Sequence, residues 1–225
     1  MRSRLKFINS SIGKKILMAV TGCFLIIFLV VHLIGNLTLF FGPGAFNGYV
    51  LVLDSVKPII RIIEVVLLLA FILHIYNGVM LWIENKQARN IKYKVNGSTE
   101  NSTLFSRTML LSGSIVLIFL VTHLSTFFWR FNFHDPLGLA NNHQYFGIIV
   151  YFFKMWWYVL LYIIAMFLLG FHLNHGFQSA FQTFGWNNKK YFPLVKHLGT
   201  LYAIIMAVAF ASMPIYFFFF YGGNQ

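Results

Sequence analysis

Four histidines lie inside long apolar stretches of this 225-residue chain, at His32, His74, His123 and His172. An ionisable side chain in such a stretch is rare, and by default it is a functional residue with a partner. Two neutral imidazoles from different helices can bind one haem iron, one on each side of the porphyrin plane. The four histidines therefore indicate haem ligation, provided that the helices bring them together in pairs.

The apolar stretches predict the helices that would position these histidines. Five stretches approach or exceed the roughly 20 residues that a membrane span needs, at about 16–41, 59–83, 108–129, 155–178 and 195–220. The chain is 59% hydrophobic and only 10% charged, whereas a typical soluble domain is about 25% charged. We expect an all-α membrane protein whose five transmembrane helices form one domain over residues 1–225. The single Cys23 excludes a disulfide framework and a cysteine metal cluster.

Basic residues in the connections predict the orientation of the helices. The chain has 17 Lys and Arg against 5 Asp and Glu. Of these 17, 13 lie in the N-terminus, in the connection after the second stretch and in the connection after the fourth. Because cytoplasmic connections keep an excess of Lys and Arg, the N-terminus is expected in the cytoplasm and the C-terminus outside. This inner charge suits anionic membrane lipid, and it does not indicate nucleic acid.

The histidines fall into two predicted layers once the helices alternate in direction. Each histidine lies 16 to 18 residues after a basic residue that precedes its stretch, and so in the second half of its helix. His32 and His123 would be level near the outer face, and His74 and His172 near the inner face. The pattern predicts two haem b groups, each bound by one pair. Zinc would need three or four ligands at one depth, and no such group is apparent.

An internal repeat links the first four stretches. Residues 18–33 and 109–124 are identical at eight of sixteen positions, including Gly22 with Gly113 and His32 with His123. The second and fourth stretches share His-x3-Gly, which aligns His74 with His172. We expect a two-helix unit used twice, with the fifth helix added. Gly22 and Gly113 lie ten residues before their histidines, about 15 Å along the helix, where they would leave room for the inner haem.

Other histidines remain as alternatives. His175 lies three residues after His172 and competes with it as a ligand, but the repeat favours His172 because the same alignment also matches Gly78 with Gly176. A fitting role for His175 is a hydrogen bond to a haem propionate or a quinone. His134, His143 and His197 are expected at the membrane interfaces.

Four motifs carry a resemblance that covers nearly the whole chain. They are SSIGKKILMAVTG (10–22), HLIGNL (32–37), FGPGAFNGY (41–49) and HLNHGFQSAFQTFG (172–185). The chain resembles the cytochrome b558 membrane subunit of succinate dehydrogenase or fumarate reductase, in the single-subunit, five-helix, di-haem class. The resemblance implies two haems b, with His32 and His123 as axial ligands of the outer haem and His74 and His172 as axial ligands of the inner haem.

The resemblance also implies partners. A FAD-containing flavoprotein and an iron–sulfur subunit would dock on the cytoplasmic side of a bacterial inner membrane, and this subunit would pass electrons to a quinone, with menaquinone favoured. The chain itself would not oxidise succinate, because it lacks a nucleotide-binding motif and the cysteines of an iron–sulfur cluster. The alternatives are a haem b subunit of another membrane redox complex, such as a hydrogenase or formate dehydrogenase, a membrane di-iron enzyme, and a cofactor-free membrane anchor.

The quinone site is the least determined part of the prediction. Glu64 is the single acidic residue inside a predicted span, and it would lie near the outer haem as a quinone-binding group. The competing interpretation pairs Glu64 with Arg61, three residues earlier on the same helix. The further candidates are, on the outer side, Asn36, Arg130 and His143 and, on the inner side, Gln178, Ser179 and Gln182.

Overall fold

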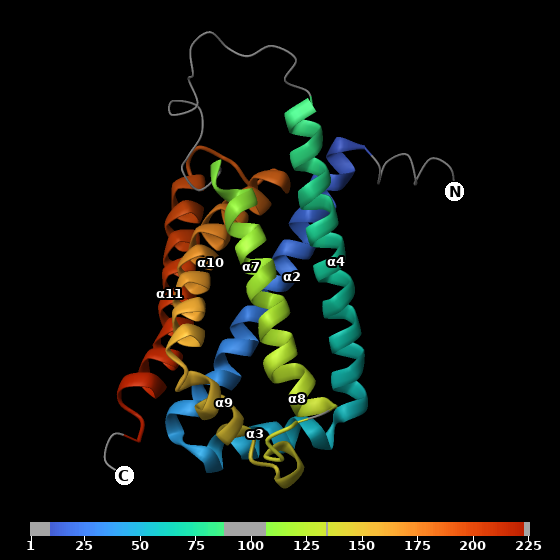
Figure 1. The fold of residues 1–225 in the computed structure, drawn as a ribbon. Helices are drawn as coiled ribbons and strands as arrows, with labels where there is room; N and C mark the ends of the chain where they lie inside the picture. The colour runs from blue at the N-terminus through green and yellow to red at the C-terminus, as the bar shows by residue number, and fades with distance from the viewer. Residues whose placement is uncertain (1–9, 88–106, 134, 223–225) are drawn as a thin grey trace. The chain divides into compact units, whose positions relative to one another are not determined.

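The computed structural model describes residues 10–87, 107–133 and 135–222, and this part of the chain is helical with no strand. Five helical segments are long and apolar enough to cross a membrane (Figure 1): Ser11–Phe41, Lys57–Gln87, Met109–Asn132, Trp156–Thr183 and Phe192–Phe219. Each overlaps one of the predicted stretches. The prediction of an all-α chain with five helices long and apolar enough to span a membrane is therefore confirmed for the described residues.

The five long segments consist of these elements: α2 (Ser11–Leu37) with the 3₁₀ turn η1 (Thr38–Phe41), α4 (Lys57–Gln87), α7 (Met109–His123) with the π-helical segment η2 (Leu124–Phe128) and α8 (Trp129–Asn132), α10 (Trp156–Thr183) and α11 (Phe192–Phe219). The connections contain α3 (Pro43–Ser55), η3 (Ala140–Asn142) and α9 (Tyr145–Phe153). The N-terminal arginines and the basic residues of 88–106 lie outside the described residues, so the predicted orientation stays a prediction.

The chain forms two compact units, and each long segment contributes to both. Unit 1 comprises Met1–Phe28, Ile63–Ser112 and Phe171–Ala203, and unit 2 comprises Leu29–Ile62, Gly113–Gly170 and Ile204–Gln225. His74 and His172 belong to unit 1, and His32 and His123 belong to unit 2. Each predicted histidine pair is therefore contained in a single unit.

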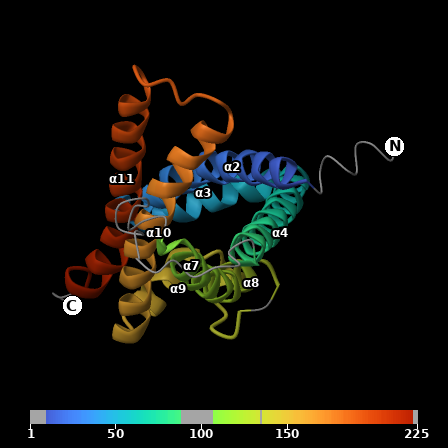
Figure 2. The same ribbon diagram turned by 90° about the horizontal axis from the view of Figure 1, so that it is seen from above.

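In unit 1, helices α10 and α11, drawn in orange and red in Figure 1 and Figure 2, are in contact through their side chains. A Cβ atom added to Gly199 would lie 2.8 Å from the ring of Phe177, so the glycine is needed for this approach. The buried Asn174 amide donates a hydrogen bond to Thr200 Oγ1 at 3.3 Å. Helix α10 thus has one side fixed against α11.

Helix α10 ends in a glycine cap at Gly185. Gly185 has φ +80°, the N–H of Trp186 donates to Phe181 O, and the N–H of Gly185 donates to Gln182 O. This is the Schellman arrangement, which satisfies the last carbonyls of a helix. The rings of Phe181 and Trp186 add the apolar contact that accompanies it, with centroids 5.4 Å apart.

In unit 2, the two short helices α3 and α9 pack on each other, and the hydropathy pattern does not predict them. The N–H of Phe146 donates to Asn47 Oδ1 at 2.9 Å, and the rings of Phe46 and Phe146 are in edge contact. Gly42, with φ +89°, turns the chain out of η1, and Pro43 begins α3. The connections that contain α3 and α9 therefore hold folded helices that pack on each other.

The segment that follows His123 is a π-helix, Leu124–Phe128. A π-helical turn holds one more residue than an α-helical turn and occurs mostly as a single turn, often at functional sites. Its Thr126 and Phe127 are buried. The extra residue changes which side chains after His123 face the core of unit 2.

The connection after α8 is organised around Asp135, whose side chain is fully buried. The carboxylate accepts hydrogen bonds from the N–H groups of Leu137 and Ala140 and from Arg130 Nη1. Burial raises the pKa of this carboxyl, but these donors outweigh burial and hold the pKa below its ordinary value. The ionised carboxylate therefore stabilises the loop.

We expect Gly185→Ala to lower the free energy of unfolding by about 1–2 kcal/mol, because alanine is strained at positive φ. Thermal unfolding in detergent, followed by circular dichroism, measures the change. Gly48→Ala is the matched control, since this glycine is helical and a Cβ there meets open space. Equal destabilisation by both variants would contradict the role of the cap.

Acid should open the loop that Asp135 organises. A carboxyl with a lowered folded-state pKa contributes stability above its unfolded value, here 3.8, and that stability is lost as the pH falls through the folded-state pKa. We expect proteolysis of the 135–142 connection to increase below about pH 4, and Asp135→Asn to be cleaved at pH 7. Glu84→Gln is the control, because Glu84 pairs with Lys14 in unit 1 and the connection belongs to unit 2.

Candidate functional site

The first histidine pair lies in unit 1, where α4 carries His74 and α10 carries His172. Their ring centroids are 6.2 Å apart and their planes are inclined by 62°. Both side chains are half-buried. Two residues that are 98 positions apart in the sequence thus present imidazoles to each other.

Hydroxyl groups contact the Nδ1 atoms of both rings. Thr21 Oγ1 lies 3.2 Å from Nδ1 of His74, and Ser112 Oγ lies 3.5 Å from Nδ1 of His172. Each hydroxyl already donates its proton to a carbonyl of its own helix, to Leu17 O and to Met109 O. The hydroxyl oxygens are therefore placed to accept a proton from Nδ1, which leaves Nε2 of each imidazole available for a metal.

Glycines give the first pair its space. A Cβ at Gly22 would lie 3.4 Å from Cε1 of His74, so Gly22 lies next to that imidazole. A Cβ at Gly78 would meet the Met18 side chain at 3.3 Å. Gly113 directly follows the buried Ser112 on α7. A role of Gly22 and Gly113 in packing against haem stays a prediction.

The second pair lies in unit 2, where α2 carries His32 and α7 carries His123. The ring centroids are 5.8 Å apart and the planes are nearly perpendicular, at 87°. The amide nitrogen of Asn36 donates to the carbonyl of His32 at 2.8 Å and lies 3.4 Å from both nitrogens of its ring. Phe210 of α11 flanks His32, with ring centroids 5.8 Å apart.

His123 makes a short polar contact with a hydroxyl group on another helix. Its Nδ1 lies 2.8 Å from the hydroxyl of Tyr162 on α10. Phe119 and Phe127 flank the His123 ring, with centroids at 5.6 and 5.4 Å. The imidazole is therefore held by one polar contact inside an aromatic surround.

The separation of the imidazole rings in each pair is close to the separation of two imidazoles that bind one metal. With metal–nitrogen bonds of about 2.0–2.1 Å, two trans imidazoles have their centroids roughly 6–6.5 Å apart. The observed separations are 5.8 and 6.2 Å. Metal binding does not fix the angle between the two ring planes, because each ring can rotate about its own metal–nitrogen bond. Residues of both pairs could thus hold the axial positions of a haem iron.

The donor set of each centre consists of two histidines. Across the described ranges, no group of three or more His, Cys, Asp or Glu is arranged to hold a metal ion. A tetrahedral zinc site uses three or four protein ligands, and two ligands alone suit a metal whose equatorial positions are filled by a macrocycle. A haem at either pair stays a prediction.

The remaining predicted candidates are spread over both units. His175 is half-buried on α10 in unit 1, and the ring that faces His74 is that of His172. Glu64 is half-buried on α4 in unit 1, and Arg61, in unit 2, donates to Asn132 at 2.9 Å. His143 and His197 are exposed, and His134 lies outside the described residues. A role for any of these side chains in quinone binding stays a prediction.

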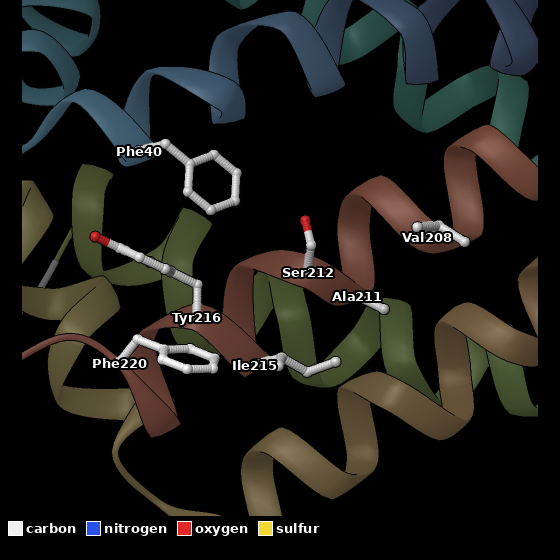
Figure 3. Close-up of a pocket in the computed structure, with 7 residues that line it drawn as sticks. All are labelled: Phe40, Val208, Ala211, Ser212, Ile215, Tyr216 and Phe220. Atoms are coloured by element: carbon white, nitrogen blue, oxygen red, sulfur yellow. The ribbon is translucent and has the colours of Figure 1, made fainter.

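A groove of about 490 Å³ lies in unit 2 between η1 and α11 (Figure 3). It is lined by Phe40, Val208, Ala211, Ser212, Ile215, Tyr216 and Phe220. The wall is almost entirely apolar, and the Ser212 hydroxyl donates to the carbonyl of Ala209. None of the predicted quinone candidates lines this groove.

Sequence reasoning missed the hydroxyl partners of the histidines, although signals for them exist. Thr21 and Ser112 occupy the same position in the internal repeat, directly before Gly22 and Gly113. Aligning His74 with His172 also places Tyr162 in register with Glu64, ten residues before each histidine. A search for polar side chains at equivalent positions of two apolar helices would have identified the pair Thr21 and Ser112 and the position of Tyr162.

Comparisons with known proteins add no relative. No family model, no curated protein and no solved structure matches the chain. The functional assignment therefore depends on the motifs and on the geometry of the two histidine pairs.

Proposed function

We propose that this protein is a di-haem cytochrome b membrane subunit of a succinate:quinone oxidoreductase. The observation that carries the proposal is the arrangement of four histidines as two facing pairs, with centroids 5.8 and 6.2 Å apart. Hydroxyl oxygens next to Nδ1 in three of the four rings support it, because a metal-binding histidine ordinarily directs its other nitrogen to a second-shell partner.

The chain's own residues would bind and orient the cofactor. His32 and His123 would hold one haem b, and His74 and His172 the other. Thr21, Ser112 and Tyr162 would keep the proton on Nδ1. A bound haem supplies one-electron transfer between ferric and ferrous iron, and the apolar helices around each pair exclude water from it.

The motifs shared with the cytochrome b558 class support the specific complex. On this proposal a flavoprotein with FAD and an iron–sulfur subunit dock on the cytoplasmic side of a bacterial inner membrane. The subunit anchors them and transfers electrons to a quinone, with menaquinone favoured and Glu64 as the proposed quinone-binding residue. Succinate chemistry resides in the partners.

Purified protein should contain two haems b per chain. A reduced-minus-oxidised spectrum with quantified pyridine haemochrome measures them. His123→Ala should remove one haem and leave the pair of His74 and His172 loaded, because the pairs use different helices. A chain with no haem would overturn the proposal in favour of a cofactor-free anchor.

The His172 assignment has a matched test. We expect His172→Ala to lose one haem and His175→Ala to retain both, because His172 is the residue whose ring faces His74. Haem stoichiometry of the two variants distinguishes the assignments. The reverse result would assign the ligand to His175.

The identity of the complex is a separate question from the haem content. Affinity purification of the tagged chain from its native membrane should recover a flavoprotein with covalent FAD and an iron–sulfur protein. Recovery of a hydrogenase or formate dehydrogenase subunit instead would retain the two haems and reassign the complex.

A further inference from the structure

We propose that Tyr162 is a positioning residue for His123, and that its phenol oxygen accepts the Nδ1 proton and so lowers the reduction potential of one haem only. This inference rests on the proposed function, because it concerns a haem bound between His32 and His123. It assigns a role to a side chain that lies on a different helix from both of these ligands.

The contact is short and fixed by packing. The Tyr162 hydroxyl lies 2.8 Å from Nδ1 of His123, and the tyrosine is only 6% exposed. Its ring meets Phe119, Tyr158 and Phe153 with centroids at 4.7, 5.0 and 5.1 Å. The phenol therefore cannot turn away from His123 without displacing a buried aromatic cluster.

Iron binding decides the direction of this hydrogen bond. A neutral imidazole carries one proton, and a ring that binds iron through Nε2 must carry it on Nδ1. The phenol oxygen then accepts from Nδ1. Its own proton is free to turn towards Tyr158, whose buried hydroxyl makes no hydrogen bond of standard geometry in the described structure.

The direction of the bond fixes the sign of the effect. An acceptor on Nδ1–H increases the basicity of a histidine ligand. A more basic ligand stabilises ferric iron over ferrous iron, so the reduction potential falls. Removal of the phenol oxygen should shift the potential of this haem to a more positive value.

The other three histidines have different partners. Thr21 and Ser112 contact His74 and His172 at the longer distances of 3.2 and 3.5 Å. Beside His32, the Asn36 group that lies 3.4 Å from the ring nitrogens is the amide nitrogen, which already donates to a carbonyl. Loss of Tyr162 should therefore change one haem and leave the other unaltered.

The test is a spectroelectrochemical redox titration of the full-length Tyr162→Phe protein in detergent, with haem stoichiometry measured in parallel. Tyr202→Phe is the matched control, because the Tyr202 hydroxyl donates to the carbonyl of Ile26 at 2.8 Å and its loss removes a hydrogen bond of the same kind. We expect two haems in both variants, a positive shift of one potential in Tyr162→Phe, and no shift in Tyr202→Phe. The low-spin ferric EPR signal of the same haem should also change.

Two unaltered potentials in a fully loaded Tyr162→Phe protein would overturn the inference and leave the proposed function intact. If Tyr162→Phe loses the haem, Tyr162→Gln, which keeps an acceptor oxygen, should recover it. Loss of both haems from both variants, with Tyr202→Phe fully loaded, would assign Tyr162 to folding and also overturn the inference. Absence of haem from the unaltered protein would contradict the proposed function itself.

Discussion

An imidazole N–H inside a membrane helix needs an acceptor, and much of the internal arrangement depends on that requirement. No water is present in the bilayer core to satisfy an exposed polar group, so the protein must supply the partner. Thr21 and Ser112 provide hydroxyl oxygens for His74 and His172, and Tyr162 provides one for His123. Once Nδ1 is satisfied in this way, the second nitrogen of each of these three rings has a defined direction and is available to bind a metal.

Hydropathy was sufficient to predict the long helices, because an apolar stretch of this length forms few stable structures other than a membrane-spanning helix. Histidine spacing indicated the pairs because side-chain depth follows from residue number in a straight helix. The prediction failed to include α3 and α9. Their residues are as apolar as a span but too few to form one, and their stability comes from packing between Phe46 and Phe146, which no local pattern encodes.

The contact between Tyr162 and His123 was missed for a different reason. Tyr162 and His123 are 39 positions apart, and their contact depends on how α7 and α10 are rotated about their axes. The π-helical segment after His123 alters that rotation for every later residue of its helix. Spacing rules assume a uniform helix, so they lose accuracy where an extra residue is inserted. Spacing does not predict a quinone site for a similar reason, since its candidates depend on loop positions and on side-chain direction.

The π-helical segment Leu124–Phe128 also separates His123 from the connection that follows α8. A wide turn can take up a change of length or twist by small movements of its backbone, and a uniform α-helix transmits the same change along its axis. His123 directly precedes this turn, and the connection organised by Asp135 follows it. The turn therefore lies between the backbone of His123 and that of the connection, so a displacement of the connection need not be transmitted to the imidazole.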